Sequence, residues 1–371
     1  MKNPKIPLVD LERQYHKIRH QINSAIFSVL EDSSFILGPH VAEFEDKFAS
    51  YIGVKHCVAV SSGTDALLLA YMALGIGKGD EVITVANTFF ATTEPLYLLG
   101  AKPVFVDVNP DTYLIDPSKI VQKITKKTKA IVPVHLYGQI ADMRTIKKIA
   151  KKYKLKIIED SAQAHGATYA GHYAGTFGDV GVYSFYPGKN LGAYGDAGCL
   201  VTNDDFLATF FRKMRDHGRI SKYEHDVSGL SARMDGIQGA ILSVKLKYLS
   251  EWVRKRRNIA KVYDKLLPPG IKKPVETGGN QHAYHLYVIE TENRDSLLKF
   301  LNDNGIGAGI HYPVPLHKQK VYKNTSSGRV YLPVTEKSAK NILSLPIFPE
   351  MTLGEVKKVS SFVRQFLARR S

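Results

Sequence analysis

Cysteine and tryptophan are scarce in this chain of 371 residues, which contains two cysteines and a single tryptophan. The cysteines, Cys57 and Cys199, form no CxxC pair, which argues against both a structural zinc site and a disulfide framework. No Walker, GxSxG or HExxH motif occurs either. We therefore expect no bound metal, and thiols that stay reduced as they do in the cytoplasm.

Long apolar runs are absent as well. The longest apolar stretch is ALLLAYMALGIG, which begins at Ala66, whereas a membrane-spanning helix needs roughly 20 apolar residues. The first residues, MKNPKIPLVDLERQYHK, lack the apolar core of a signal peptide. These two absences predict a cytoplasmic protein that does not bind to a membrane.

Acidic residues are outnumbered, because 51 Lys and Arg face 35 Asp and Glu and give a formal net charge of +16. Part of the excess lies between residues 147 and 156, where lysines alternate with apolar residues in a helical pattern. This pattern is typical of a solvated helix face. Nucleic-acid binding and attraction of an anionic substrate are the alternatives. No nucleic-acid motif accompanies the charge, so we expect no nucleic-acid partner.

Hydrophobic residues make up 44% of the chain and charged residues 23%, as in soluble globular proteins. Short β-branched runs alternate with helical patterns up to about residue 216. This alternation predicts a mostly parallel sheet with helices on both faces. The expected strands cover Val58–Val60, Glu81–Val85, Pro103–Val106, Ala130–Val134, Lys156–Glu159, Gly181–Phe185 and Cys199–Thr202, and the expected helices cover Thr64–Leu74, Ala91–Leu98, Arg144–Lys152 and Asp205–Asp216.

The pattern changes near Val244–Tyr263, where VKLKYLSEWVRKRRNIAKVY predicts one long charged amphipathic helix. The sequence thus predicts two domains, a large α/β domain over residues 1–245 and a smaller α+β domain over residues 246–371. Within the second domain we expect a strand at Ala283–Glu290, a helix from Arg294, a strand near Ile306–His311 and a final helix from Leu353.

Three segments with polar side chains each follow a predicted strand, and in a parallel sheet such strand ends face a common ligand crevice. In the first, SSGTDALLLA, the strand Val58–Val60 is followed by Ser61, and a helix opens at Thr64. A glycine-containing turn at a helix N-terminus offers free backbone N–H groups and suits a phosphate. An ordinary Ser/Thr helix cap is the alternative.

The second segment is IIEDSAQAHG, in which Asp160 follows the end of an apolar strand. A carboxylate in such a desolvated place needs a cationic partner or several donors, and a protonated ring nitrogen is one such partner. Gln163 and His165, close behind, can hydrogen-bond a substituent of the same ring. Asp160 as the cap of the next helix is the alternative.

The third segment, GVYSFYPGKNLGAYGDAGCLVT, presents Ser184 and then Lys189 after the strand Gly181–Phe185. A lysine in an apolar, glycine-lined loop can lose its proton and become a nucleophile, as Schiff-base chemistry requires. An ordinary surface lysine is the alternative. Taken together, a phosphate cradle, a ring-nitrogen carboxylate and an activated lysine are the parts of a pyridoxal phosphate (PLP) site.

A series of motifs runs in a fixed order along nearly the whole chain: FILGPHVAEFEDKFASYIG, SSGTDALLLA, ITVANTFFATTEP, GAKPVFVDVNPDTY, VPVHLYGQ, IIEDSAQAHGA, SFYPGKNLGAYGDAG, GIHYPVPLHKQ and LSLPIFPEM. Through these motifs the chain resembles the sugar-nucleotide aminotransferases of the DegT/StrS type, which are PLP enzymes. The resemblance implies an α/β fold, that of a fold-type I PLP-dependent transferase. Such a fold has a large, mostly parallel-sheet α/β domain and a smaller C-terminal α+β domain.

The resemblance also implies PLP as the cofactor, with PMP as its aminated form. It assigns the internal aldimine to Lys189 and the partner of the pyridinium nitrogen to Asp160. Some relatives are dehydratases in which histidine replaces the lysine, so Lys189 indicates transamination. The other implied cofactor contacts are Gln163 at the phenolic oxygen, Phe89 stacked on the ring, and Gly63, Thr64 and Ser184 at the phosphate.

For the substrate, the resemblance implies contacts from Tyr312 and His317 in HYPVPLH, and from Arg219 in RDHGR to the diphosphate. One position departs from the pattern. Many relatives carry an asparagine in GxNxRM or GxNxRL that reaches the cofactor phosphate of the neighbouring subunit, and here Ser231 stands in that place. A hydroxyl can also donate to phosphate, with a shorter reach. We expect a homodimer with shared active sites.

The implied reaction moves an amino group, with glutamate as the expected donor, onto a keto sugar carried by a nucleoside diphosphate. KYEHDVSGLSARMD followed by VKLKYLSEW resembles relatives that aminate carbon 3 more than those that aminate carbon 4. Two alternatives stay open. The chain could aminate a keto-cyclitol, or it could be a catalytically silent PLP-fold regulator or binding protein.

Overall fold

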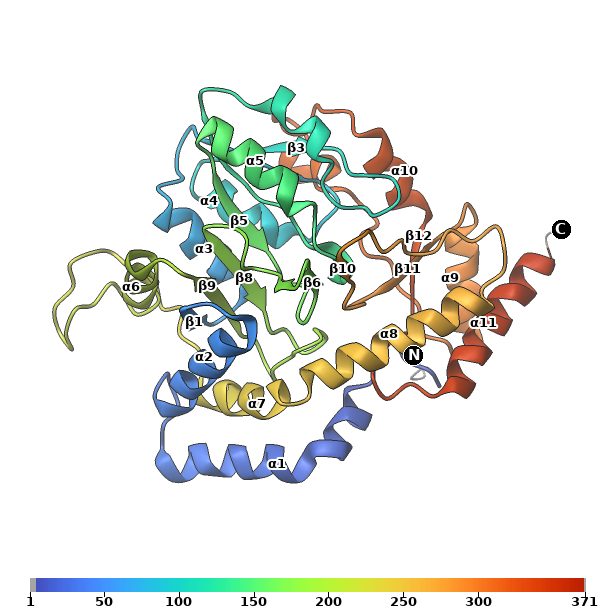
Figure 1. Ribbon diagram of the computed structural model, residues 1–371, viewed down its shortest axis with the longest axis horizontal. Helices are drawn as coiled ribbons and strands as arrows, with labels where there is room; N and C mark the ends of the chain where they lie inside the picture. The colour runs from blue at the N-terminus through green and yellow to red at the C-terminus, as the bar shows by residue number, and fades with distance from the viewer. Residues whose placement is uncertain (1–4, 370–371) are drawn as a thin grey trace.

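A computed structural model describes residues 5–369 of the chain, and its centre is a seven-stranded sheet (Figure 1). Strand β9 runs antiparallel to β1 and β8, and the other neighbouring pairs run parallel. The mostly parallel sheet predicted from the sequence is therefore confirmed. In spatial order the strands are β1 (His56–Val60), β9 (Gly198–Thr202), β8 (Val180–Ser184), β5 (Lys156–Asp160), β4 (Thr128–Ile131), β2 (Glu81–Val85) and β3 (Lys102–Val106).

Both faces of this sheet are buried. Val58 and Val60 point into a core formed with α3 (Gly63–Ala73) and α6 (Asp205–Met214). Cys57 and Ala59 point the other way, into a core formed with α2 (Pro39–Ile52) and α5 (Met143–Tyr153). Because successive strand residues face opposite sides, a sheet covered on both faces has apolar residues at consecutive positions.

Helix α5 carries the lysine cluster that the sequence predicted to be a solvated face. Its apolar residues Met143, Ile146 and Ala150 are buried, while Lys147 and Lys151 are exposed. The helix therefore presents its charge to solvent on one side and its apolar stripe to the sheet on the other.

The long helix predicted over Val244–Tyr263 is two helices, so that prediction is wrong. Helix α7 (Gly236–Leu246) ends in a tight turn at Lys247 and Tyr248, and α8 (Leu249–Leu266) follows. Neither glycine nor proline marks the break. Helix α7 packs against α2 and against α1 (Leu11–Asp32), two helices that the sequence analysis did not predict.

The C-terminal part contains a two-stranded antiparallel sheet of β11 (Tyr287–Glu290) and β12 (Ile342–Leu345). The core beneath it takes residues from α8, α9 (Arg294–Asp303) and α11 (Leu353–Ala368). The strand expected near Ile306–His311 does not form. That segment makes single bridges only, and β12 pairs with β11 instead. The remaining elements are α4 (Glu94–Leu98), α10 (Pro333–Asn341), β6 (Thr168–Tyr169), β7 (His172–Tyr173) and β10 (Asn280–Gln281).

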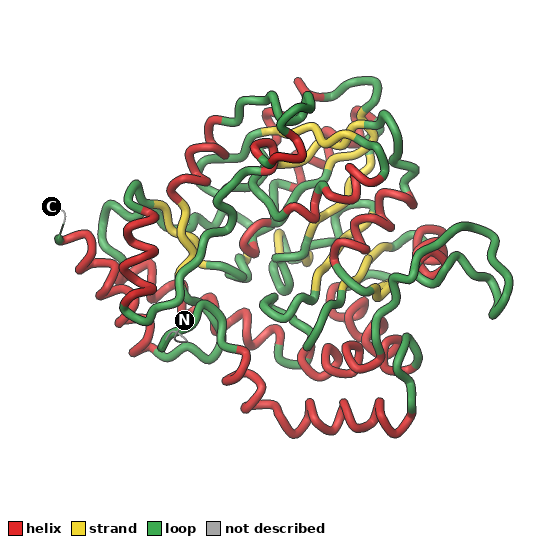
Figure 2. Tube along the Cα trace, turned by 180° about the vertical axis from the view of Figure 1, so that it is seen from behind, coloured by secondary structure: helices red, strands yellow, loops and turns green. Residues whose placement is uncertain are grey.

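A long segment between α6 and α7, residues 215–235, extends away from the body of the protein in both views and is called the arm below (Figures 1 and 2). Its tip exposes large apolar side chains, among them Tyr223, which is 80% exposed. The base of the arm is attached to the sheet, because Ser61 N–H donates to the carbonyl of Ala232 at 3.2 Å. The domain boundary predicted between residues 245 and 246 falls in the last turn of α7 and stays a prediction.

Candidate active site

The carboxyl ends of β1, β5 and β8 lie at one edge of the sheet, because β9 reverses direction between β1 and β8. A cavity of about 520 Å³ opens at this edge. The polar segments of all three strand ends contribute to it, as the sequence predicted. Its lining is Ser62, Gly63, Thr64, Leu67, Thr88, Phe89, Ala91, Thr92, Val134, Asp160, Ala162, Gln163, Ser184, Tyr186, Lys189, Asp196 and Tyr312.

The N-terminus of α3 forms one wall of the cavity. Ser62 caps the helix, since its hydroxyl oxygen accepts from Asp65 N–H at 3.0 Å. The N–H groups of Gly63 and Thr64 lie in the first turn, where the helix supplies no acceptor. The hydroxyl of Ser184 faces the same turn and accepts from Tyr186 N–H at 3.4 Å, which leaves its proton available. These donors can bind an anion.

Glycine is required at residue 63 because α3 and the end of β8 are in contact there. A Cβ atom on Gly63 would lie 2.6 Å from Cβ of Ser184, well inside van der Waals distance. The same holds on the neighbouring strand, where a Cβ on Gly198 would lie 2.4 Å from the carbonyl carbon of Ser62. The two glycines therefore allow the start of α3, the end of β8 and the start of β9 to pack closely at the anion-binding turn.

Asp160 ends β5 and is 5% exposed. Its two oxygens accept separate hydrogen bonds, Oδ2 from the Thr92 hydroxyl at 2.8 Å and Oδ1 from Ala162 N–H at 3.2 Å. Thr92 in turn accepts from the hydroxyl of Thr88 at 2.9 Å. The carboxylate therefore has a fixed orientation at the cavity wall. This role of Thr92 was not predicted, because a threonine near the start of an expected helix gives no signal of it.

Lys189 lies in a tight turn after β8 and lines the cavity. Its own N–H donates to the carbonyl of Tyr186 at 2.9 Å, and Asn190 Nδ2 donates to the carbonyl of Ala283 at 3.0 Å. Burial lowers the pKa of Lys189 to about 8, although the negative charge of Asp160 acts in the opposite direction. Near neutral pH the Lys189 amine is therefore uncharged and nucleophilic in a fraction of the molecules.

Gln163 and Tyr312 form a hydrogen-bonded pair at the cavity. The N–H of Tyr137 donates to Oε1 of Gln163 at 2.8 Å, so Nε2 is directed to the hydroxyl of Tyr312 at 3.1 Å. The ring of Tyr312 lies 5.8 Å from that of Phe89, centroid to centroid. Burial raises the pKa of the Tyr312 phenol, and the charge of Asp160 adds to that effect. Tyr312 is thus a neutral hydroxyl that faces the site.

His165, which the sequence suggested as a ring contact beside Gln163, does not line the cavity in this structure, so the contact stays a prediction. It is 1% exposed and packs against Tyr183 and Phe185 at ring centroid distances of 5.1 and 5.6 Å. Burial lowers the pKa of His165 to about 3, which keeps the ring neutral.

Three predicted residues lie outside the cavity of this chain. Arg219 and Ser231 belong to the arm, where Arg219 pairs with Asp216 at 2.7 Å and Ser231 accepts from Arg233 at 3.2 Å. His317 is 1% exposed, and its Nε2 lies 3.0 Å from Glu336. The structure therefore does not bring these three side chains to Lys189 within one subunit, and their roles stay predictions.

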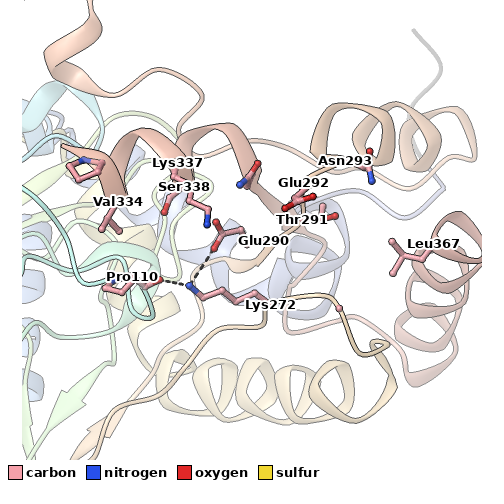
Figure 3. Close-up of a pocket in the computed structure, with 13 residues that line it drawn as sticks. Pro110, Lys272, Glu290, Thr291, Glu292, Asn293, Val334, Lys337, Ser338 and Leu367 are labelled. Atoms are coloured by element: carbon pink, nitrogen blue, oxygen red, sulfur yellow. Dashed lines mark hydrogen bonds and ion pairs between the residues drawn. The ribbon is translucent and has the colours of Figure 1, made fainter. Parts of the chain in front are cut away.

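A second hollow, of about 670 Å³, lies beside α10 and contains none of the predicted site residues (Figure 3). Two lysines, Lys272 and Lys337, line it, and Lys272 is paired with Glu290 at 3.4 Å and with the carbonyl of Pro110. Residues 5–369 contain no cluster of His, Cys, Asp and Glu arranged to hold a metal ion. None of the helices in this range combines the length and apolar character that a membrane crossing requires.

Comparison with known proteins bears on the chemistry of the cavity. The chain is 45% identical over 369 residues to a protein of Geobacillus stearothermophilus named pleiotropic regulatory protein. The alignment covers 97% of this chain and 99% of that protein. It is 42% identical over 353 residues to UDP-2-acetamido-2-deoxy-3-oxo-D-glucuronate aminotransferase of Pseudomonas aeruginosa, at 95% and 98% coverage.

Among solved structures, NtdA of Bacillus subtilis with bound cofactor PMP aligns with a TM-score of 0.90 and 34% identity, over 99% of this chain and 86% of that one. The fold-type I fold implied by the sequence motifs is thereby confirmed. Residues 16–364 match the DegT/DnrJ/EryC1/StrS aminotransferase family. Since the match spans nearly the whole chain and the fold agrees with it, this chain belongs to the DegT/DnrJ/EryC1/StrS aminotransferase family.

Proposed function

We propose that the chain is a PLP-dependent aminotransferase that transfers an amino group from glutamate to carbon 3 of a keto sugar carried by a nucleoside diphosphate. The main support for this proposal is that the three predicted parts of the site line one cavity. Lys189, Asp160 and the N-terminus of α3 enter it from three different strand ends. Nucleophile, ring-nitrogen partner and anion cradle are thus within reach of one small aromatic phosphate.

The residues present fit PLP at both ends. At the phosphate end, a side chain on Gly63 would fill the space against Ser184, and the free donors of Gly63, Thr64 and Ser184 suit an anion. At the ring end, Asp160 accepts one hydrogen bond with each oxygen and lies at the cavity wall, where a carboxylate can hold a ring nitrogen protonated.

Gln163 and Phe89 complete the proposed cofactor contacts. Nε2 of Gln163 is directed into the cavity by Tyr137 and can donate to the phenolic oxygen of the ring. Phe89 is 57% exposed at the cavity wall, where it can stack on a flat ring. When bound, PLP supplies an aldehyde carbon that bonds to amines and a ring that withdraws electrons from the adjacent carbon.

Lys189 has two tasks in this proposal. With PLP bound, its uncharged Nζ would hold the cofactor covalently. When free of the cofactor, the same Nζ would be the group that takes up and gives back the proton at Cα of the amino acid. A pKa of about 8 suits both tasks, since a proton shuttle works best with a pKa near the operating pH. Asp160, with its orientation fixed by Thr92, would stabilise a protonated ring nitrogen of the bound cofactor.

The arm supports a homodimer with shared sites. Arg219 and Ser231 lie on a segment that extends away from its own subunit, and the exposed apolar residues Ile220 and Tyr223 lie near Arg219. In the proposed dimer, Arg219 contacts the substrate diphosphate and Ser231 the cofactor phosphate of the partner subunit. Tyr312 contacts the sugar from within the subunit. His317, whose ring is buried against Glu336, acts on substrate only through the segment it supports.

A 3-oxo sugar nucleotide is the substrate named for the Pseudomonas relative, which favours carbon 3. The regulatory name of the Geobacillus relative keeps a silent regulator as the second candidate. The two buried cysteines are free thiols, as expected for an enzyme that works in the cytoplasm.

Assaying the purified chain with glutamate against a panel of 3-keto and 4-keto nucleotide sugars and a keto-cyclitol tests the proposal. We expect amination of a 3-keto nucleotide sugar. A visible absorbance band that does not respond to glutamate, together with no product from any member of the panel, would favour the silent regulator.

A further inference from the structure

A second buried lysine lies behind the turn that carries Lys189. Lys245, in the last turn of α7, has no exposed surface. Its Nζ donates to the carbonyl of Gly192 at 2.6 Å and lies 4.3 Å from the ring centroid of Tyr194. Among the described residues, its hydrogen-bond acceptor is thus a backbone carbonyl and not a carboxylate.

Gly192 and Tyr194 belong to the segment that presents Lys189. The segment folds back on itself, since Ala193 N–H donates to the carbonyl of Phe185 at 2.7 Å. Pro187 and Gly192 meet inside this fold, where a Cβ on Gly192 would lie 2.3 Å from the Pro187 carbonyl oxygen. The position of Gly192 therefore determines the shape of the whole turn, residues 186–194.

Helix α7 holds this turn at two points. Besides the bond from Lys245, Oε1 of Gln238 accepts from the N–H of Tyr194 at 2.9 Å. Residues 238 and 245 are seven apart, so they lie on the same face of the helix two turns from each other. The turn is thus fixed to a rigid element.

Packing alone does not account for a lysine at residue 245. A buried amino group carries a desolvation cost that an apolar side chain of similar length avoids. Burial lowers the pKa of Lys245 to about 7, while the negative charge of Glu350 opposes the shift. Whether charged or neutral, the amine can donate a hydrogen bond to the carbonyl of Gly192. A methionine side chain has no donor and could not make this bond.

We propose that Lys245 is a positioning residue for Lys189, which it serves by holding the Gly192 carbonyl and so fixing the turn 186–194. The inference rests on the proposed role of Lys189, and it concerns a residue that does not itself line the cavity.

Hydrogen exchange of the full-length protein, followed by mass spectrometry with and without added PLP, tests the proposal. In Lys245→Met, the amides within residues 186–194 should exchange about ten- to a hundredfold faster, because the variant leaves the buried carbonyl of Gly192 without its donor. Lys247→Met removes an exposed lysine two residues away and should leave exchange unchanged. If the methionine variant fails to fold, Lys245→Gln carries the same prediction, because its side chain is a bond shorter.

The catalytic consequence is measured separately. In Lys245→Met, kcat should fall about tenfold, while KM for the nucleotide sugar stays close to the wild-type value. Wild-type exchange in the turn of a folded Lys245 variant would overturn the proposal, as would a rise in KM with unchanged kcat. A wild-type protein that aminates no substrate would instead contradict the proposed function, and the exchange result would still decide whether Lys245 holds the turn.

Discussion

The hydroxyl group of Thr92 donates a hydrogen bond of 2.8 Å to Oδ2 of Asp160. Thr88 donates to Thr92 in turn, so a chain of two hydroxyl groups ends on the carboxylate. In the proposed mechanism this carboxylate keeps the ring nitrogen protonated. The chain of hydroxyls therefore determines how the ring-nitrogen partner is oriented.

Replacing Thr92 with valine, which is nearly isosteric, should lower kcat about tenfold, as expected for a lost hydrogen bond to a charged group. The loss in Thr88→Val should be smaller, because Thr88 reaches Asp160 only through Thr92. Asp160→Asn should be the most impaired of the three, since an amide carries no negative charge. Steady-state kinetics on the three variants measures this ranking, and a Thr92→Val enzyme as active as wild type would refute it.

Gly63→Ala should lower both PLP affinity and stability, because the added Cβ would lie 2.6 Å from Cβ of Ser184. Overpacking of this kind lowers the free energy of unfolding by roughly 1–3 kcal/mol. Gly77→Ala is the matched control, since a Cβ there meets nothing within 4 Å. Urea unfolding and PLP titration of both variants provide the measurement. Equal behaviour of the two would show that the turn at Gly63 has room to spare.

Covalent attachment of PLP to cofactor-free protein should become faster as pH rises, with a midpoint near pH 8. Only the uncharged amine reacts, and burial lowers the pKa of Lys189 from 10.5 to about 8. Because Asp160 raises that pKa by its charge, Asp160→Asn should move the midpoint to lower pH. Stopped-flow absorbance over a pH series measures the midpoint. A midpoint near 10.5 would mean that Lys189 is an ordinary exposed amine.

Mixing inactive Lys189→Ala with inactive Arg219→Ala should restore about a quarter of wild-type activity, because half of the dimers would then contain one intact site. The expectation follows from the arm, the segment of residues 215–235 that contains Arg219 and extends away from the body of the protein. Subunit exchange must be verified with differently tagged chains. If exchange occurs without recovery, Arg219 and Lys189 serve the same site from one chain.

The strand ends were predictable from the sequence because each combines an apolar run with an abrupt polar turn. Asp160 after Ile157–Ile158 and Gly63 after Val58–Val60 are local signals, and the shared edge follows from the parallel sheet. Helix α1 gave a weaker signal. Its buried residues Ile18 and Ile22 share the helix with exposed Phe27 and Leu30, so the apolar pattern does not mark a single face.

The contacts of Thr92 and Lys245 could not be predicted from the sequence. Thr92 and Asp160 are 68 residues apart, and Lys245 and Gly192 are 53 residues apart. Each pair meets only because of how the helices pack on the sheet. The break between α7 and α8 could not be predicted either, because the segment around Lys247 contains no glycine or proline to mark it.

Borohydride reduction of the purified full-length protein, followed by peptide mapping, identifies the lysine that binds PLP. Reduction makes the bond between PLP and its lysine permanent, so the labelled residue can be identified by mass. We predict a pyridoxyl group on Lys189 in the wild-type protein, and no label at this position in a folded Lys189→Ala variant. Label on a different lysine of the wild-type protein, or none after incubation with PLP, would contradict the assignment of this cavity as the aminotransferase site.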